Sequence, residues 1–91
     1  MSQSFRRTAA TMSTEVGDDV VALQAERGFA YGMEEVTAAV WRLLQEPHDL
    51  DAIVAALTAE YDVSEAQCRE EVGALLDRMI AEGLVEREEV R

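Results

Sequence analysis

The first third of the chain alternates between apolar and polar residues with the period of β-strands. Residues 11–16 and 19–25 have this alternation or a high β-branched content, and the Gly17-Asp18 pair between them is a hairpin turn signal. Residues 29–32 alternate aromatic with small side chains, so the two rings fall on one face of a third strand. Short connections place consecutive strands side by side. The pattern therefore predicts a three-stranded antiparallel meander with residues 29–32 at one edge.

From Met33 onward the apolar positions recur every three or four residues, which is the period of amphipathic α-helices. A first helix over about residues 34–45 has to end before Pro47, because the residue preceding a proline is pushed out of the helical conformation. Asp49 is a suitable N-cap for a second helix over residues 50–61, whose apolar stripe continues for three turns.

A third helix, the longest, has signals at both ends. Ser64 and Gln67 have the spacing of a capping box at its start, and Gly83 followed by Leu84 is typical of a Schellman ending. The apolar residues between these signals keep the helical period throughout.

Together these elements predict an α+β, winged-helix-like fold, with a three-stranded antiparallel β-meander followed by three α-helices. A chain of 91 residues has room for one core, so residues 1–91 are expected to form a single domain. We expect an ordered core over about residues 8–86, with flexible termini. Trp41, Tyr61 and the Met and Leu residues of the helical stripes are expected in the core.

Charge narrows the range of partners and chemistry. The chain has 19 acidic and 8 basic residues and a net charge of -11, so it repels phosphates and nucleic acid is disfavoured as a partner. All eight basic residues are arginines, which excludes Schiff bases and the lysine of a phosphate-binding loop.

The residues that carry catalysis or bind metals are few and scattered. Cys68 lies on the apolar stripe of the third helix, whereas His48 lies in a polar turn, so the two are not expected to form a catalytic pair. They also lack the spacing of metal ligands. Neighbouring acids such as Glu34 and Glu35 point about 100° apart on a helix and serve solubility. The sequence thus predicts no enzyme, no metal and no cofactor.

The N-terminal segment has two arginines but no apolar run, so it resembles neither a signal peptide nor a membrane anchor. The single cysteine cannot form an internal disulfide. These features predict a cytoplasmic protein that does not associate with membranes.

The predicted edge strand at residues 29–32 is the feature most suggestive of binding. Small residues let another backbone approach, and an edge strand offers free N–H and C=O groups to an added strand. The same pattern also fits ordinary core aromatics with turn glycines. The edge could equally pair with a second copy of the chain and form a homodimer.

Several short motifs follow one another at set intervals along residues 8–86. They are DDVVAL at 18–23, GFAYGM at 28–33, VWRLL at 40–44, AAL at 55–57 with EYDV at 60–63, and EV at 71–72 with LL at 75–76 and GLV at 83–85. In this order they resemble the PqqD-like family, the recognition elements for precursors of ribosomally made, modified peptides (RiPPs). The chain departs from the family at Glu34, where an Asn cap is usual, and at Thr37, where Gly or Ala is common.

Stand-alone members of this size resemble the leader-binding protein of lasso-peptide biosynthesis, with the PqqD proteins of the cofactor pathway as a nearby alternative. The resemblance implies a non-catalytic protein that binds a precursor's leader peptide as an added strand and presents it to separate enzymes. Those enzymes would be a leader-cleaving cysteine protease and a lasso cyclase.

By position, the resemblance also implies which residues bind the peptide. Main-chain contacts would come from the third strand, and a groove wall would come from the third helix. These residues are Phe29, Ala30, Tyr31 and Gly32 on the strand and Arg69, Val72, Leu76 and Met79 on the helix. Arg69 could meet a leader carboxylate, or it could be a solvated charge on the helix face.

Two other functions fit parts of the pattern. A winged-helix DNA-binding or antitoxin-type regulatory module would need a basic recognition helix, but the third helix offers only Arg69 and Arg78 among five acids. A carrier protein would need a modifiable Ser in an Asp-Ser-Leu setting, whereas Ser64 stands between Val63 and Glu65.

Overall fold

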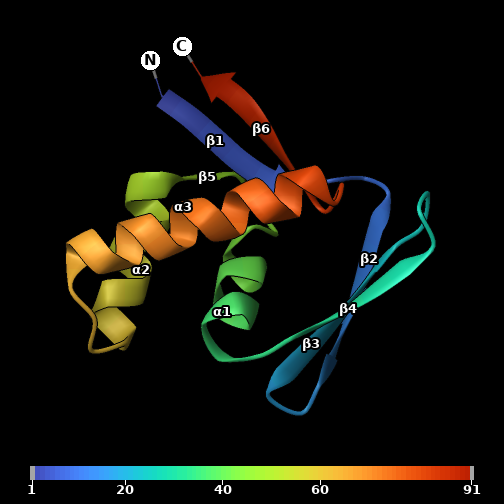
Figure 1. The fold of residues 1–91 in the computed structure, drawn as a ribbon, viewed down its shortest axis with the longest axis horizontal. Coiled ribbons are helices and arrows are strands. Elements are labelled where there is room, and N and C mark those ends of the chain that lie inside the picture. Colours follow the sequence, from blue (N-terminus) through green and yellow to red (C-terminus); the bar gives the residue numbers. More distant parts are fainter. Residues whose placement is uncertain (1, 91) are drawn as a thin grey trace.

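The predicted meander is present in the computed structural model, which describes residues 2–90 (Figure 1). Its strands are β2 (Thr11–Val16), β3 (Asp19–Gln24) and β4 (Phe29–Met33), paired antiparallel in the order β2-β3-β4. Gly17 has a φ of 63° at the first position of the turn between β2 and β3, where two-residue hairpins favour glycine. The strand boundaries differ from the predicted ones by one residue at most.

Three helices follow the meander, as predicted: α1 (Glu35–Leu43), α2 (Leu50–Glu60) and α3 (Glu65–Ala81). The α+β class is therefore confirmed, and the winged-helix description fits loosely. The carboxylate of Asp49 caps α2 by accepting a hydrogen bond from the Ala52 amide at 2.7 Å.

The start of α3 is capped differently from the predicted capping box. The Ser64 hydroxyl accepts a hydrogen bond from the Gln67 amide at 3.2 Å, as expected. The Gln67 side chain, however, donates to the Glu71 carboxylate at 3.3 Å, one turn further along the helix. An acceptor at i+4 on the same helix face thus replaces the reciprocal half of the box.

The end of α3 is a Schellman motif, as predicted. The Leu84 amide donates to the Met79 carbonyl at 2.9 Å and the Gly83 amide to the Ile80 carbonyl at 3.1 Å. Gly83 has a φ of 77°, a conformation that glycine adopts without a steric penalty.

A second three-stranded sheet, missed by the sequence analysis, joins the two ends of the chain. It consists of β1 (Ser2–Arg7), the short β5 (His48–Asp49) and β6 (Val85–Val90), in the order β5-β1-β6. Figure 1 shows β1 and β6 side by side with both termini at the same end. These strands extend beyond the expected ordered core of about 8–86, because β1 pairs with a segment some eighty residues away and local periodicity does not reveal such pairing.

The core lies between the two sheets and the helices. Trp41 and Leu44 from the first helical segment, Ile53 and Leu57 from α2, and Leu76 from α3 are at most 2% exposed. Trp41 is thus a core residue, as expected, whereas Tyr61 is only half-buried and packs against the edge of the core. No helix within residues 2–90 is both long enough and apolar enough to cross a membrane.

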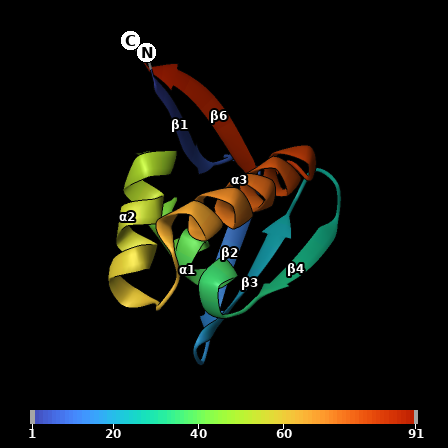
Figure 2. The ribbon, with the colours of Figure 1, turned by 60° about the vertical axis from the view of Figure 1, so that its left-hand side comes forward.

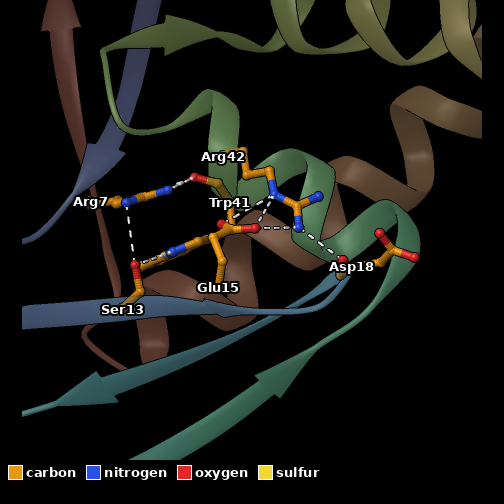
Figure 3. A network of polar contacts seen from close by, with 6 residues as sticks. All are labelled: Arg7, Ser13, Glu15, Asp18, Trp41 and Arg42. Carbon is orange, nitrogen blue, oxygen red and sulfur yellow. Dashed lines mark hydrogen bonds and ion pairs between the residues drawn. The ribbon is translucent and has the colours of Figure 1, made fainter.

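Trp41 also anchors a polar network that joins α1 to β1 and β2 (Figure 3). The Arg7 guanidinium donates to the Trp41 carbonyl at 2.7 and 3.0 Å and lies 4.4 Å from the centre of the indole ring. The indole N–H donates to the Ser13 hydroxyl at 3.0 Å. These contacts satisfy the polar atoms around a fully buried indole and tie α1 to the β2 side of the meander.

A second contact in the same network lies nearer solvent. Arg42 on α1 contacts the Glu15 carboxylate on β2, with the shortest N–O distance at 2.7 Å, and donates to the Asp18 carbonyl at 2.9 Å (Figure 3). Together these contacts fix α1 against β2 and the turn between β2 and β3.

Candidate functional site

The β4 strand is an edge of the meander. It pairs with β3 along its whole length, with Tyr31 opposite Ala22 and Gly32 opposite Val21. No other strand within residues 2–90 pairs with it. One side of β4 is therefore free of strand partners in the part of the chain that the structure describes.

The turn before β3 shows which way the backbone groups of β4 point. That two-residue turn closes on Val16 and Asp19, so these two residues exchange hydrogen bonds. Residues of a central antiparallel strand bond alternately to its two neighbours. Ala22, three residues after Asp19, therefore bonds toward β4, where its partner is Tyr31. The N–H and C=O groups of Tyr31 are used within the sheet.

The backbone groups of Ala30 and Gly32 consequently point away from β3. Both residues are exposed, and a Cβ built on Gly32 would meet no atom within 4 Å. These two residues offer N–H and C=O groups that a further strand could use.

The side chains of β4 divide between the two faces of the sheet. Phe29, Tyr31 and Met33 share the face that carries the buried β3 residues, and burial increases along them from exposed Phe29 to buried Met33. The rings of Phe29 and Tyr31 are 6.4 Å apart and tilted by 58°. The expectation that both rings lie on one face is confirmed.

A groove runs between this edge and α3. It holds a cavity of about 210 Å³, lined on the strand side by Tyr31, Gly32 and Met33. On the helix side the lining comes from four residues on one face of α3 and at its end. These are Leu75, Arg78, Met79 and Glu82. A strand added to β4 would therefore place alternate side chains beside an apolar helix face with one positive and one negative group.

The charges in the groove act on Tyr31. Partial burial raises the pKa of the Tyr31 hydroxyl, and the neighbouring Glu82 carboxylate raises this pKa further. The Tyr31 hydroxyl and the Glu82 carboxylate therefore lie close together on the wall of the groove.

A second cavity of about 260 Å³ adjoins the groove where α1, α2 and α3 meet. Thr37, Leu75 and Arg78 line both cavities. The remainder of the second lining is mainly apolar, with Leu57 and Tyr61 from the α2 side. The groove beside β4 thus leads into a larger apolar hollow.

Contacts at the end of α3 fix its distance from the meander. The Gln24 side chain, at the end of β3, donates to the Gly83 carbonyl at 3.2 Å, and its oxygen accepts from the Arg27 amide at 2.9 Å. The Arg27 guanidinium donates to the Ala81 carbonyl at 2.7 Å. The β3–β4 turn therefore holds the end of α3, and with it one wall of the groove.

The eight residues expected at the site lie in several places. Phe29, Ala30, Tyr31 and Gly32 form the edge, and Met79, 3% exposed, lies beside them in the groove. The other three helix residues do not line this cavity. Val72 lines the second cavity, Leu76 is buried in the core, and Arg69 lies between α2 and α3.

Arg69 is held by acidic neighbours rather than by the groove. Its guanidinium pairs with Asp51 at 2.6 Å and with Glu65 at 3.2 Å, and these partners raise the pKa of Arg69. All three side chains are substantially exposed. The structure therefore shows a solvated ion-pair cluster, one of the two roles considered for this residue.

Leu75, Arg78 and Glu82 line the groove but were missed by sequence reasoning. With Met79 they follow the spacing i, i+3, i+4, i+7, which marks one face of a helix. Of the expected helix residues, only Met79 shares this face. Val72 and Leu76 are buried, and Arg69 lies between α2 and α3. Two charged residues that alternate with two apolar ones at this spacing were the available signal for the groove-lining face.

The metal-ligating side chains and the single thiol are the other chemical groups that bear on the function of residues 2–90. No group of three or more His, Cys, Asp or Glu side chains is placed to hold a metal ion in this part of the chain. Cys68 is buried, and burial raises the pKa of its thiol, so the reactive thiolate is disfavoured.

Comparison with known proteins places this geometry in a family. The family model described as Coenzyme PQQ synthesis protein D (PqqD) matches residues 19–85. A search of curated proteins finds no match.

Two solved structures share the fold. One is described as TbiB1 in complex with the TbiA(beta) leader peptide, with a TM-score of 0.85 and 28% identity over 89% of this chain and 94% of that one. The other is described as lasso peptide synthetase B1 complexed with the leader peptide, with a TM-score of 0.80 and 20% identity over 90% of this chain and 96% of that one. Because the family model covers both the β3–β4 edge and α3, which together form the groove, the chain belongs to the PqqD family.

Proposed function

We propose that this chain is a non-catalytic recognition protein that binds the leader segment of a ribosomally made precursor peptide by β-strand addition. The observation that carries the proposal is the β4 edge beside the α3 groove, which has no second strand partner among residues 2–90. A leader strand would use the outward N–H and C=O groups of Ala30 and Gly32 and place alternate side chains against Tyr31 and Met79.

The solved structures support this proposal. Both similar chains are described as complexes with a leader peptide, and their folds match nearly the whole chain. The match at 20% identity supports the fold alone, whereas TbiB1, at 28%, also supports the leader as the kind of ligand.

We place the chain in lasso-peptide biosynthesis, acting in the cytoplasm beside a separate leader-cleaving cysteine protease and a cyclase. Binding a disordered leader raises the local concentration of the precursor near these enzymes. The ordering of the leader costs free energy, which main-chain hydrogen bonds and apolar side chains in the groove offset. The chain itself then needs no catalytic group.

The experiment that tests the proposal is fluorescence polarisation with a labelled leader peptide, taken from the precursor encoded beside the gene for this chain. We expect saturable binding, with a scrambled leader of the same composition as the control. The TbiA(beta) leader serves as a second probe that reports how far specificity has diverged. Equal affinity for the native and scrambled leaders would contradict the proposal.

The winged-helix DNA-binding alternative is not favoured. Of the two arginines on α3, Arg69 is paired with Asp51 and Glu65, and Arg78 lies in the groove beside β4. This helix therefore lacks the basic surround that contacts phosphates. A gel shift at low salt that showed tight, steeply salt-dependent binding would revive the alternative.

A second copy of the chain that paired with β4 to form a homodimer would compete with the leader for the same backbone groups. Sedimentation of the free chain, repeated with saturating leader, separates the two occupants. A dimer that the leader dissociates would mean that self-pairing and leader binding compete for β4.

A further inference from the structure

The outer face of the β2–β3–β4 sheet is apolar and exposed. Four large apolar side chains on β2 and β3 point to this face, and all four are exposed. They are Met12 at 63%, Val16 at 55%, Val21 at 39% and Leu23 at 38%. Four of the six exposed large apolar residues found in the described chain thus gather on one sheet face.

The helices leave this face uncovered. Along β3 the residues alternate strictly between exposed and buried, so only one side of the sheet contacts the core. In Figure 2, α1 and α3 lie on the same side of the meander. The outer face has no covering element within residues 2–90.

The outer face continues to the proposed peptide edge. Ala30 and Gly32 of β4 stand opposite Leu23 and Val21 and share their face. A strand added to β4 would extend the sheet, and every second side chain of that strand would project from the same outer face. The bound peptide and the sheet would then form one continuous surface.

Charge indicates what kind of molecule fits this surface. Asp18 and Asp19, both exposed, stand at the β2–β3 turn, at one end of the apolar face. Two copies of a chain with a net charge of -11 repel each other, which disfavours self-association through this face. A partner with an apolar patch and basic residues at its rim would match both the apolar side chains of this face and its negative charge.

We propose that the outer face of the β2–β3–β4 sheet docks the enzyme that processes the bound precursor, through an apolar patch rimmed by basic residues on that enzyme. The proposal rests on the proposed leader-binding function. It names a surface separate from the α3 groove. Because the added strand forms part of the surface, the enzyme binds the leader-loaded chain more tightly than the free chain, and the leader gains affinity by the same factor.

The test uses the full chain, its leader peptide and the purified leader-cleaving enzyme encoded with the same precursor. Affinity for the enzyme is measured by biolayer interferometry with and without saturating leader. A Val21→Thr/Leu23→Thr variant replaces the centre of the patch with residues that keep β propensity. We expect it to bind the enzyme at least about tenfold more weakly, while its leader affinity by fluorescence polarisation stays within about twofold.

The matched control is Val36→Thr, which removes an equally exposed valine, 39%, that lies on α1 and lines the second cavity rather than the outer face of the sheet. We expect its affinity for the enzyme to be unchanged. Met12→Thr, at the most exposed position of the patch, is a second variant that spares the partly buried residues, and circular dichroism verifies the fold of each variant.

The outcomes separate the docking surface from the proposed function. Unchanged enzyme affinity in both patch variants, with leader binding intact, overturns the docking surface and leaves the proposed function standing. A wild-type dimer that the double variant abolishes assigns the face to a second copy and also overturns it. Absence of leader binding in the wild type overturns the proposed function and this inference with it.

Discussion

At the scale of single residues, the direction of each backbone group decides what β4 can bind. The hydrogen-bond alternation set by the Val16–Asp19 pair directs the groups of Tyr31 into the sheet and those of Ala30 and Gly32 outward. Side-chain identity on β4 is secondary to this alternation, since strand addition uses main-chain groups.

Replacing Gly32 with proline removes an outward N–H without touching the β3–β4 ladder. Proline is tolerated on an edge strand where its missing N–H would face solvent, so the fold should persist. We expect leader affinity to fall by about tenfold, since a lost hydrogen bond is worth about 1 kcal/mol and the ring also obstructs close approach. Fluorescence polarisation measures the affinity.

The matched control is Gly32→Ala, which keeps the N–H and places its Cβ in open space. Its leader affinity should stay within about threefold of wild type. Tyr31→Pro, by contrast, should lower the free energy of unfolding, because it removes a group that bonds β3. Equal affinities for Gly32→Pro and Gly32→Ala would show that this edge does not receive the leader.

The Glu15–Arg42 pair makes part of the stability dependent on pH. The hydrogen bond from Arg42 lowers the pKa of Glu15. A carboxyl group whose pKa is lower in the folded state than in the unfolded state stabilises the fold at pH values above its unfolded-state pKa of about 4.3. This stabilisation is lost as the pH falls through the folded-state pKa. Glu15→Gln should therefore lower the free energy of unfolding at pH 7, and this loss should become smaller as the pH falls below about 4.3.

Urea unfolding at pH 7, 5 and 2 measures this difference. Glu60→Gln, an exposed position on α2 without an ion pair among the described residues, is the control for general charge effects. A destabilisation by Glu15→Gln that persists unchanged at the lowest pH would mean that the pair is not its source.

At the scale of elements, the placement of α3 against the β3–β4 hairpin makes the groove. Gln24 and Arg27 hold the last turn of the helix, and the helix then runs past β4 with one face toward the edge. The groove therefore depends on contacts at the helix end as well as on the residues that line it.

Gly83→Ala should disturb that attachment. The position has a φ of 77°, and an added Cβ would lie 2.8 Å from Nε2 of Gln24. We expect a loss of at least about 1–2 kcal/mol in the free energy of unfolding from the left-handed conformation alone, together with weaker leader binding. Thermal unfolding and fluorescence polarisation measure the two effects.

The control is Gly73→Ala inside α3, where an added Cβ meets nothing within 4 Å. Alanine favours the helix there by about 0.5–1 kcal/mol, so this variant should gain stability and keep its leader affinity. Similar losses of stability in both variants would contradict the role given to the α3 end.

A second pair of variants asks which α3 face meets the leader. Leu75→Gln alters the groove and the adjoining cavity, whereas Arg69→Ala removes the ion pairs between α2 and α3. We expect Leu75→Gln to weaken leader binding by about tenfold and Arg69→Ala to change it by less than about twofold. A larger loss of leader affinity in Arg69→Ala than in Leu75→Gln would show that the leader binds on the Arg69 side of the helix.

At the scale of the whole molecule, the second sheet closes the fold by joining its two ends. Phe5 on β1 is 6% exposed and lies in the core, and the Arg87 guanidinium is 5.6 Å from the centre of its ring. This sheet is separate from the leader edge. We therefore expect changes in this sheet to affect stability without altering the groove beside β4.

Phe5→Ala should lower stability without changing leader affinity. Truncating a buried phenylalanine costs about 3–5 kcal/mol, so urea unfolding should show a large loss of stability. Leader affinity of the fraction that remains folded should be unchanged, because Phe5 does not line the groove. A lower leader affinity per folded molecule would show that the second sheet also influences the leader site.

The extent to which sequence predicted the structure follows from the range of the interactions involved. The meander and helices were predicted because turn glycines, caps and apolar spacing act over a few residues. The β1–β6 pairing was missed, since the β1 sequence SQSFRR has a single large apolar residue and its partner strand lies at the other end of the chain.

The candidate site divides in the same way. The β4 edge follows from strand order, whereas the face of α3 that lines the groove depends on how the helix is rotated. That rotation is set by long-range contacts such as Gln24 to Gly83. Residues 69, 72 and 76 were therefore assigned to the groove although Leu75, Arg78 and Glu82 line it.

The most direct test of strand addition at β4 is residue-resolved amide hydrogen exchange by NMR, with and without the leader peptide. We predict that the Ala30 and Gly32 amides exchange freely in the isolated chain and are slowed by more than about tenfold when the leader binds. The Tyr31 amide should be protected in both states. Leader binding that left exchange at Ala30 and Gly32 unchanged would contradict the account.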